Sequence, residues 1–270
     1  MNVSFRPLPQ ASQVAGLTAL VLALMGPGMA WAADSPPAPS AGDGWRLGVA
    51  AVPAPQVPGA KVRTTGRIEV LAGLMGQGGA PLQAVAADQA GPQLAQGELD
   101  AWVGVLPATA DVPATVRRTM LDWSAAPMAI MRTDTDIHAW ADLSGRTVCL
   151  SEDSRVTGEL AARFGAVEQV YASSADALLA LRIGQCDAAV QDEDFLRQLL
   201  QFPEWRKFSA QLAPYRPQTL TRLVRDDLPA PRKTAVRQAT APERLHELAR
   251  QQARDIAFEV YLDQTVPDCH

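Results

Sequence analysis

Residues 147–192 read TVCLSEDSRVTGELAARFGAVEQVYASSADALLALRIGQCDAAVQD, and their pattern decides the fold. Short apolar runs of strand character alternate with segments whose apolar residues recur at helical spacing. The strand-like runs are 147–150, 168–172 and 187–191, and the helical segments are 154–164 and the stretch that opens at Ser173. Gly165 and Gly184 follow the two helical segments, at the position where helices most often end. The order is β-α-β-α-β, which predicts parallel strands covered by helices.

The segment before it carries a second, weaker copy of this unit. Strand-like runs and helical patterns alternate again, at 45–50 (strand), 67–76 (helix), 82–86 (strand), 93–96 (short helical turn) and 101–105 (strand). Both copies end alike, because Gly97-Glu-Leu-Asp100-Ala matches Gly184-Gln-Cys-Asp187-Ala at Gly, Asp and Ala. Asp187 is therefore expected to be structural, like Asp100. We expect two similar α/β lobes, with no long linker between them.

The N-terminus has the pattern of an export signal. Arg6 supplies a basic start, Val14–Met25 is an apolar run, and Ala30-Trp-Ala32 is a small-x-small cleavage site. The apolar run is too short to span about 30 Å of hydrocarbon at about 1.5 Å per residue. We therefore interpret residues 1–32 as a signal peptide and 33–44, rich in Pro, Ser, Gly and Ala, as a flexible leader.

The net charge and the Cys and His spacing argue against a nucleic-acid partner and against a metal site. The whole chain has a net charge of -5 and a pI near 5.3, whereas a general nucleic-acid binder is usually basic. We expect no nucleic-acid partner. The three Cys show no CxxC pair and the three His are scattered, so we expect no metal site.

The C-terminal region has a helical pattern. Thr240-Ala-Pro-Glu243 is similar to a capping box with proline near the first turn. An apolar stripe follows at Leu245, Leu248, Ile256 and Val260. We expect this stripe to pack against a lobe.

Three motifs together resemble bacterial solute-binding proteins of family 3, the receptors of polar amino acid ABC importers. Residues 140–148, WADLSGRTV, resemble the family's W-x-D-L-x-G-x-x-V segment. Residues 173–192 resemble its A-L-x-x-L-x-x-G-x-x-D-A-x-x-x-D segment, and Arg117-Arg-Thr-Met-Leu-Asp122-Trp-Ser124 resembles R-x-x-x-x-D-F-S. The resemblance extends from about residue 97 to 200.

This resemblance implies a type II periplasmic binding protein: two doubly wound α/β sheets joined by a double-crossing hinge. Lobe 1 would comprise 45–127 plus 220–270, and lobe 2 would comprise 134–215. The expected function is capture of a small polar ligand, an amino acid or related carboxylate, for an ABC transporter permease. We expect a periplasmic monomer without a cofactor.

The same resemblance suggests ligand-binding residues. Arg117 would hold the ligand's α-carboxylate with its bidentate guanidinium, and Asp192 would hold the α-ammonium across the cleft. Ser154 and Arg155, at a strand-to-helix junction, would contribute further contacts to a carboxylate. The alternatives are a surface arginine at Arg117 and a helix N-cap at Asp192.

Two departures from the family pattern concern this site. Asp153 stands where the family usually has a glycine, and residues 51–66 lack the aromatic residue that often stacks on the ligand. Trp102 and Trp123 could supply an apolar wall, although tryptophans in such positions more often belong to the core.

The sequence lacks the GxSxG, HExxH, P-loop and GxGxxG motifs, so no catalytic residues are predicted. Because a fold does not fix a function, two alternatives stay open. One is a dehydratase-like enzyme on the binding-protein fold, and the other is a ligand-sensing subunit of a signalling system.

A disulfide between Cys149 and Cys186 is the last expectation. In a 2-1-3 strand order the two strands concerned are neighbours, and members of the family carry Cys at both places. Export also permits disulfides. The alternative is a pair of buried thiols, and Cys269 would remain unpaired in a mobile tail.

Overall fold

The fold is taken from a computed structural model in which residues 46–50, 63–64 and 82–265 are described. The predicted signal peptide, the leader, the helix at 67–76 and Cys269 lie outside these residues.

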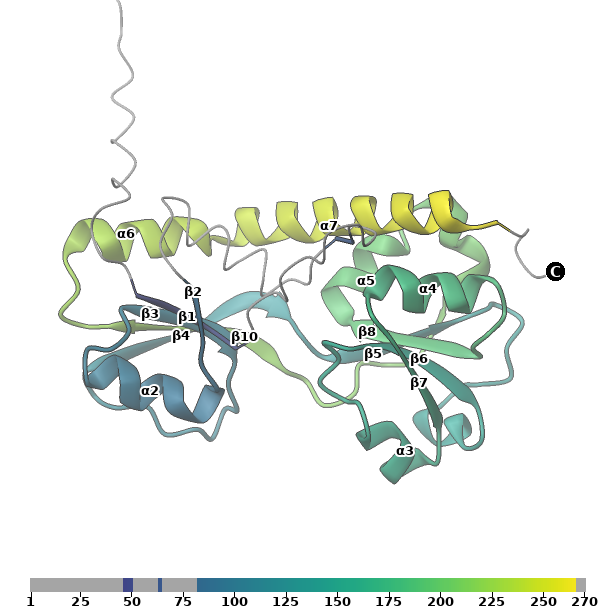
Figure 1. Cartoon of the computed structure of the whole chain (residues 1–270), viewed down its shortest axis with the longest axis horizontal. Helices are drawn as coiled ribbons and strands as arrows, with labels where there is room; N and C mark the ends of the chain where they lie inside the picture. The colour runs from purple at the N-terminus through teal and green to yellow at the C-terminus, as the bar shows by residue number, and fades with distance from the viewer. Residues whose placement is uncertain (1–45, 51–62, 65–81, 266–270) are drawn as a thin grey trace, which may run out of the picture. The chain divides into compact units, whose positions relative to one another are not determined.

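Among the described residues, the first sheet has five strands in the order β2-β1-β3-β10-β4 (Figure 1). They are β1 (Leu47–Val49), β2 (Leu82–Ala84), β3 (Ala101–Val105), β4 (Val116–Ser124) and β10 (Thr219–Arg225). β1 is parallel to β2 and β3, whereas β10 is antiparallel to β3 and β4. We call this sheet and its helices, α2 (Ala87–Ala95) and α6 (Ala230–Ala239), lobe 1.

The second sheet also has five described strands, in the order β7-β6-β8-β5-β9. They are β5 (Pro127–Met131), β6 (Thr147–Ser151), β7 (Val167–Tyr171), β8 (Ala188–Asp192) and β9 (Ala210–Gln211). The helical segments are α3 (Glu159–Phe164), α4 (Ser174–Arg182), α5 (Glu193–Leu199) and the 3-10 turns η1 (Trp140–Leu143) and η2 (Pro203–Phe208). These elements form lobe 2.

Each sheet places the second, first and third strands of its β-α-β-α-β unit side by side, which confirms the 2-1-3 order. The chain leaves lobe 1 after β4 and returns to it at β10, so the first lobe is discontinuous and two crossings join the sheets. The predicted two-lobed α/β class is therefore confirmed. Both sheets are mixed, because each ends in antiparallel strands that the repeat alone did not predict.

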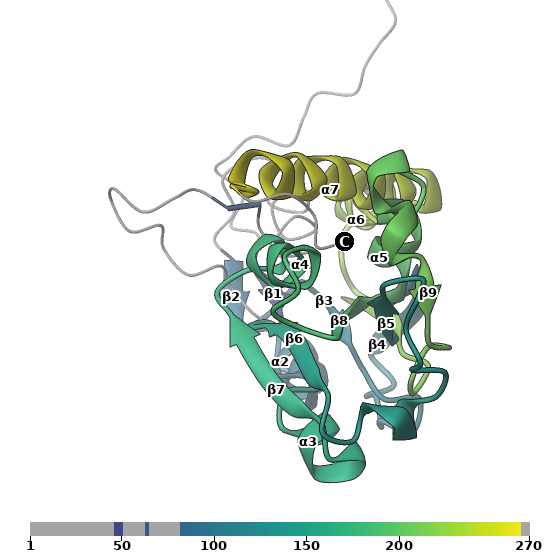
Figure 2. The same ribbon diagram turned by 90° about the vertical axis from the view of Figure 1, so that its right-hand side faces the viewer.

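The lobe boundaries differ from the expected ones at two places. β5 begins at Pro127 and already pairs with β8, so lobe 2 starts before residue 134. The long helix α7 (Pro242–Asp263) was assigned to lobe 1, but only its first part packs there, through Leu245 and Ala249. Its second part, including Ile256 and Val260, joins the core of lobe 2. Figures 1 and 2 show α7 passing along α4 and α5.

Two helices start at other residues than the pattern indicated. α2 starts at Ala87 and contains Pro92, whereas only a turn at 93–96 was expected. α3 starts at Glu159 rather than 154, because Gly158 has a left-handed φ of 80° that no α-helix accommodates.

One of the two predicted helix caps is confirmed, and the other cap and the suggested tryptophan wall are wrong. The Ser173 cap is confirmed, since its hydroxyl accepts from the N–H of Asp176 at 3.1 Å. The Thr240 cap is wrong, because its hydroxyl donates to the Val236 carbonyl. Trp102 and Trp123 are both buried in the core of lobe 1 rather than forming a ligand wall.

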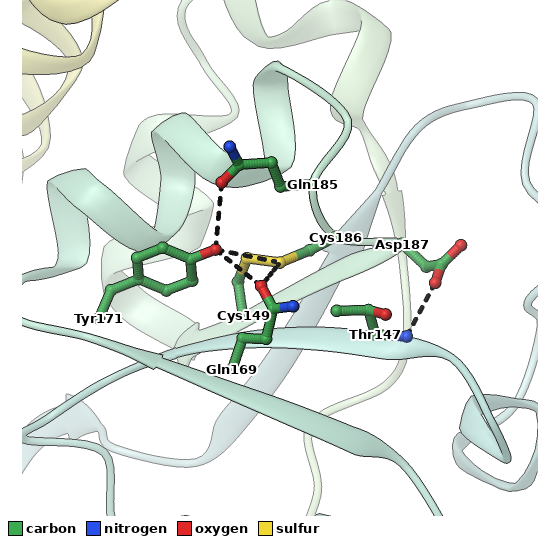
Figure 3. Close-up of a disulfide and its surroundings, with 7 residues drawn as sticks. All are labelled: Thr147, Cys149, Gln169, Tyr171, Gln185, Cys186 and Asp187. Atoms are coloured by element: carbon green, nitrogen blue, oxygen red, sulfur yellow. Dashed lines mark hydrogen bonds between the residues drawn. A yellow bond between two sulfur atoms is a disulfide. The ribbon is translucent and has the colours of Figure 1, made fainter.

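The predicted disulfide between Cys149 and Cys186 is present, with the two Cα atoms 5.8 Å apart. Cys149 lies in β6 and Cys186 lies two residues before the start of β8, and these strands are parallel neighbours. Figure 3 shows the Tyr171 hydroxyl directed at the bridge, where it also donates to Gln169 at 2.8 Å. Partial burial raises the pKa of Tyr171, so this phenol stays a neutral donor beside the disulfide.

Candidate functional site

The edge of lobe 2 where β6 and β8 end is the place at which open α/β sheets bind ligands. β6 ends at Ser151 and β8 ends at Asp192. Behind this edge, Ser151 is buried and its hydroxyl accepts from the Gln191 amide at 3.2 Å. The Gln191 amide oxygen accepts in turn from Ser174 at 3.0 Å. These contacts hold the ends of the two strands in register with the start of α4.

Arg155 is the central cation of this edge. Its Nη2 donates to Asp192 Oδ1 at 2.6 Å and also to the carbonyl of Ala125 at 2.6 Å. The side chain of Arg155 is 30% exposed and that of Asp192 is 25% exposed. The pair is thus half-buried but open to solvent, as a binding site for a small polar molecule requires.

The first crossing between the lobes connects β4 to β5, and the second connects β9 to β10. The two crossings meet beside this ion pair. The N–H of Ala125, in the first crossing, donates to the Gln218 carbonyl of the second at 2.7 Å. The N–H of Tyr215 donates to the Pro127 carbonyl at 2.7 Å. Arg155 contacts both crossings, since its Nε donates to the Gln218 side-chain oxygen at 3.4 Å. One guanidinium therefore links the strand ends of lobe 2 to both segments of the hinge.

Hydrogen bonds from Ser124 also hold the start of α5 against the first crossing. The backbone N–H of Ser124 donates to Asp194 at 2.6 Å, and its hydroxyl donates to Glu193 Oε2 at 2.6 Å. Arg197 donates to the same Glu193 carboxylate at 2.7 Å. Burial raises the pKa of Glu193, but these two donors outweigh it and hold that pKa below its ordinary value.

Asp192 and Arg155 therefore lie together, as expected for two residues of one site. The alternative role for Asp192 was an N-cap. It does occupy the N-cap position of α5, but its side chain makes no capping hydrogen bond. Its carboxylate instead faces the guanidinium of Arg155.

Ser154 lies beside Arg155 but not at a helix start. Its N–H donates to the Ser151 carbonyl at 2.9 Å, in a turn that precedes α3 by several residues. The expectation that a helix N-terminus at Ser154 would hold a carboxylate is wrong for this reason. The Ser154 hydroxyl remains close to the edge and stays part of the candidate site.

Arg117 lies elsewhere. It is 72% exposed, and its Nε donates to Asp226 at 3.0 Å. It is paired in register with Val224, whereas Ser124 at the other end of β4 contacts α5. Arg117 and Ser124 are seven residue steps apart along the extended strand, or about 23 Å. The structure therefore does not bring Arg117 and Asp192 together around one ligand.

Three contributors to the site were not predicted: Ser124, Gln218 and Glu193. Ser124 belonged to the R-x-x-x-x-D-F-S-like motif, so its position at a crossing could have been inferred from that segment. Nothing in the local sequence distinguishes Gln218. Its role follows from the backbone contact between the two crossings, which only the fold creates.

No group of three or more potential metal-ligating side chains occurs among the described residues. Nor does any helix within that part of the chain have the length and apolar character needed to cross a membrane.

Comparison with known proteins gives structural likenesses only. No family model matches the chain, and no curated protein matches it. An arginine-bound mutant of ArgBP from T. maritima is 18% identical, with a TM-score of 0.42, and the match covers 77% of this chain and 95% of that one. The periplasmic VFT2 domain of BvgS from Bordetella pertussis is 18% identical, with a TM-score of 0.38, covering 76% and 93%. The GluR0 ligand-binding core with L-glutamate is 15% identical, with a TM-score of 0.42, covering 81% and 97%. At these identities and TM-scores the matches assign neither a family nor a ligand to this chain.

Proposed function

We propose that this protein is an exported solute-binding protein that captures a small zwitterionic ligand, an amino acid or a close relative, at the edge of lobe 2. The observation that carries the proposal is the ion pair between Arg155 and Asp192 beside the two crossings. A guanidinium and a carboxylate side by side are the complement of a ligand's carboxylate and ammonium groups.

Ligand binding would exchange partners within this pair. The ligand carboxylate would accept from Arg155, and the ligand ammonium would donate to Asp192. Both side chains are already held from behind, Arg155 by the Ala125 carbonyl and Asp192 by the end of β8. Because the groups are preorganised, little side-chain entropy would be lost on binding.

The position of the pair also suits a conformational response. Arg155 contacts both crossings, so a ligand that withdraws it from Gln218 would change the contacts of the hinge itself. The partner we propose is an ABC importer permease that binds one arrangement of the hinge or lobes in preference to the other. The protein would act as a periplasmic monomer. The signal-like residues 1–32 and the disulfide support export.

The test is a thermal-shift screen of the mature chain against the twenty L-amino acids, opines and small dicarboxylates, each at millimolar concentration. A ligand that binds only the native state raises the melting temperature. At least one zwitterionic compound should do so, and no shift with any compound would contradict the function.

Calorimetry on variants then tests the site separately. Arg155→Ala and Asp192→Asn should each weaken binding of the hit by roughly 10-fold or more, since each removes a charge-assisted hydrogen bond. The control is Arg146→Gln, whose guanidinium pairs with Asp136 at 2.6 Å and is not among the groups at this edge. Unchanged affinity in both site variants would leave the function standing and refute the site.

A further inference from the structure

A polar cavity lies in lobe 1, on the face of the sheet that α6 covers. It has a volume of about 370 Å³ and is bounded by β4, β10 and α6. Its walls are dominated by cations. The cationic lining residues are Arg117, Arg222, Arg225, Lys233 and Arg237, and the acidic one is Asp226. This concentration of positive charge contrasts with the net charge of -5 of the whole chain.

Arg222 forms the floor of this cavity and is only 9% exposed. Its Nη1 donates to the Thr240 hydroxyl at 2.6 Å and its Nη2 to the Thr119 hydroxyl at 3.2 Å. Its Nε is buried without a hydrogen-bond partner. Within the described part of the chain, this buried guanidinium therefore has hydroxyl partners but no carboxylate.

A buried charge without a counterion is costly in a folded protein. Burial, followed by repulsion from Arg237, lowers the pKa of Arg222, which reports the same imbalance. An anion in the cavity would supply the missing counterion and an acceptor for the free Nε.

The neighbouring cations are only partly neutralised. Lys233 Nζ donates to the backbone carbonyl of Asp226 at 2.5 Å, and Arg237 Nη2 donates to the Thr234 hydroxyl at 3.1 Å. Both of these hydrogen-bond partners are neutral, and the only carboxylate shown to interact electrostatically with Lys233 among the described residues is that of Asp227, which already pairs with Arg225. Arg117 and Arg225, by contrast, pair with carboxylates: Arg117 with Asp226, and Arg225 with Asp227 and Asp100.

We propose that this cavity binds a phosphate-class oxyanion, between Arg222 on β10 and the α6 residues Lys233 and Arg237. Three cations whose hydrogen-bond partners are neutral match a doubly charged tetrahedral oxyanion better than a single carboxylate. Guanidinium groups also offer several N–H donors in fixed directions to such an anion. The cavity is lined by none of the residues Arg155, Asp192 or Ser154, so the proposal is independent of the proposed amino acid site.

The same chemistry could come from a free phosphate or from the headgroup of an anionic lipid. Two experiments distinguish a free phosphate from a lipid headgroup. The first is calorimetric titration of the mature protein with inorganic phosphate at constant ionic strength, with sodium chloride as the control titrant. The second is co-sedimentation with vesicles of phosphatidylglycerol, compared with vesicles of phosphatidylcholine.

We expect saturable phosphate binding that Arg237→Gln and Lys233→Gln each weaken roughly 10-fold, because each removes one charge-assisted hydrogen bond. Arg222→Met should abolish it. If that buried variant does not fold, the two α6 variants still decide the result. The matched control is Arg250→Gln on α7, whose side chain is 53% exposed and pairs with Glu247.

Binding of phosphate but not of vesicles would identify a soluble anion. Binding confined to phosphatidylglycerol vesicles, and reduced by the same α6 variants, would identify a lipid headgroup. The proposal is overturned if neither probe binds, or if Arg237→Gln and Lys233→Gln bind as tightly as the parent protein.

Discussion

The backbone N–H of Arg46 donates to the Asp100 carboxylate at 3.0 Å, and the Arg46 carbonyl accepts from the N–H of Asp100 at 2.8 Å. Lobe 2 repeats this two-way contact between Thr147 and Asp187, where both distances are 2.8 Å. In each lobe the aspartate thus ties the start of the third strand to the start of the first. The sequence match between the Gly-x-x-Asp segments at 97–100 and 184–187 reports this shared structural role.

The two aspartates differ in burial, which predicts different costs of removal. The Asp100 side chain is 4% exposed and lies within 3.5 Å of three arginines, whereas that of Asp187 is 40% exposed. We expect Asp100→Ala to lower the free energy of unfolding by about 3 kcal/mol, because it removes a buried carboxylate that accepts the backbone N–H of Arg46 and contacts three arginines. Asp187→Ala should cost about 1 kcal/mol or less. Urea denaturation measures both, and equal losses would contradict the distinction.

The disulfide is expected to stabilise the fold. It closes a loop with a sequence separation of 37 residues, for which the chain-entropy estimate is about 3–4 kcal/mol. Replacing Cys149 and Cys186 together by alanine should lower the free energy of unfolding by about that amount, measured by urea denaturation. Thiol titration of the denatured, unreduced protein should find one reactive group, and the fully reduced protein should give three. Three thiols before reduction would refute the bridge.

The repeated unit explains why so much of the fold could be predicted. Strands β3, β6 and β8 are short, mostly apolar runs bounded by glycine or polar turns, so they can be recognised locally. The disulfide was expected from the 2-1-3 order of the same unit together with the family resemblance and the export signal. α3 was predicted too long because Gly158 interrupts an otherwise helical pattern, and glycine can sit inside or outside a helix.

The candidate site was harder to predict because it depends on contacts between distant segments. Asp192 ends β8 and Arg155 lies in the turn after the neighbouring β6, so their placement at one edge follows from topology. Arg117 was placed by the resemblance of residues 117–124 to a family motif. The long β4 begins at Val116, so Arg117 becomes a strand residue facing α6 instead of the ligand cleft.

The C-terminal helix offers a test of its assignment to both lobes. Ile256 is 1% exposed and belongs to the core of lobe 2, whereas Phe258, two residues along the same helix, is 61% exposed. Ile256→Ala should lower the free energy of unfolding by about 2–5 kcal/mol, the usual cost of a cavity. Phe258→Ala should change it by less than about 0.5 kcal/mol. Similar losses for the two variants, measured by chemical denaturation, would show that α7 packs differently.

Glu193 connects the start of α5 to the first crossing and predicts a stability that depends on pH. Its folded-state pKa lies below the unfolded value of 4.5, because the donors Ser124 and Arg197 outweigh burial. A carboxylate with a depressed pKa stabilises the fold fully above its unfolded pKa. That stabilisation is lost as the pH falls through the folded pKa. We therefore expect Glu193→Gln to flatten the fall in unfolding free energy between about pH 5 and pH 3.

Ser124→Ala is the matched variant for this prediction. It removes the hydroxyl donor to Glu193 but keeps the backbone N–H that donates to Asp194. The folded-state pKa of Glu193 should then rise toward its ordinary value, and the loss of stability in acid should become smaller than in the parent protein. Urea denaturation at a series of pH values measures both effects. Parallel stability curves for the parent, Glu193→Gln and Ser124→Ala would mean that the Glu193 carboxylate does not hold the crossing.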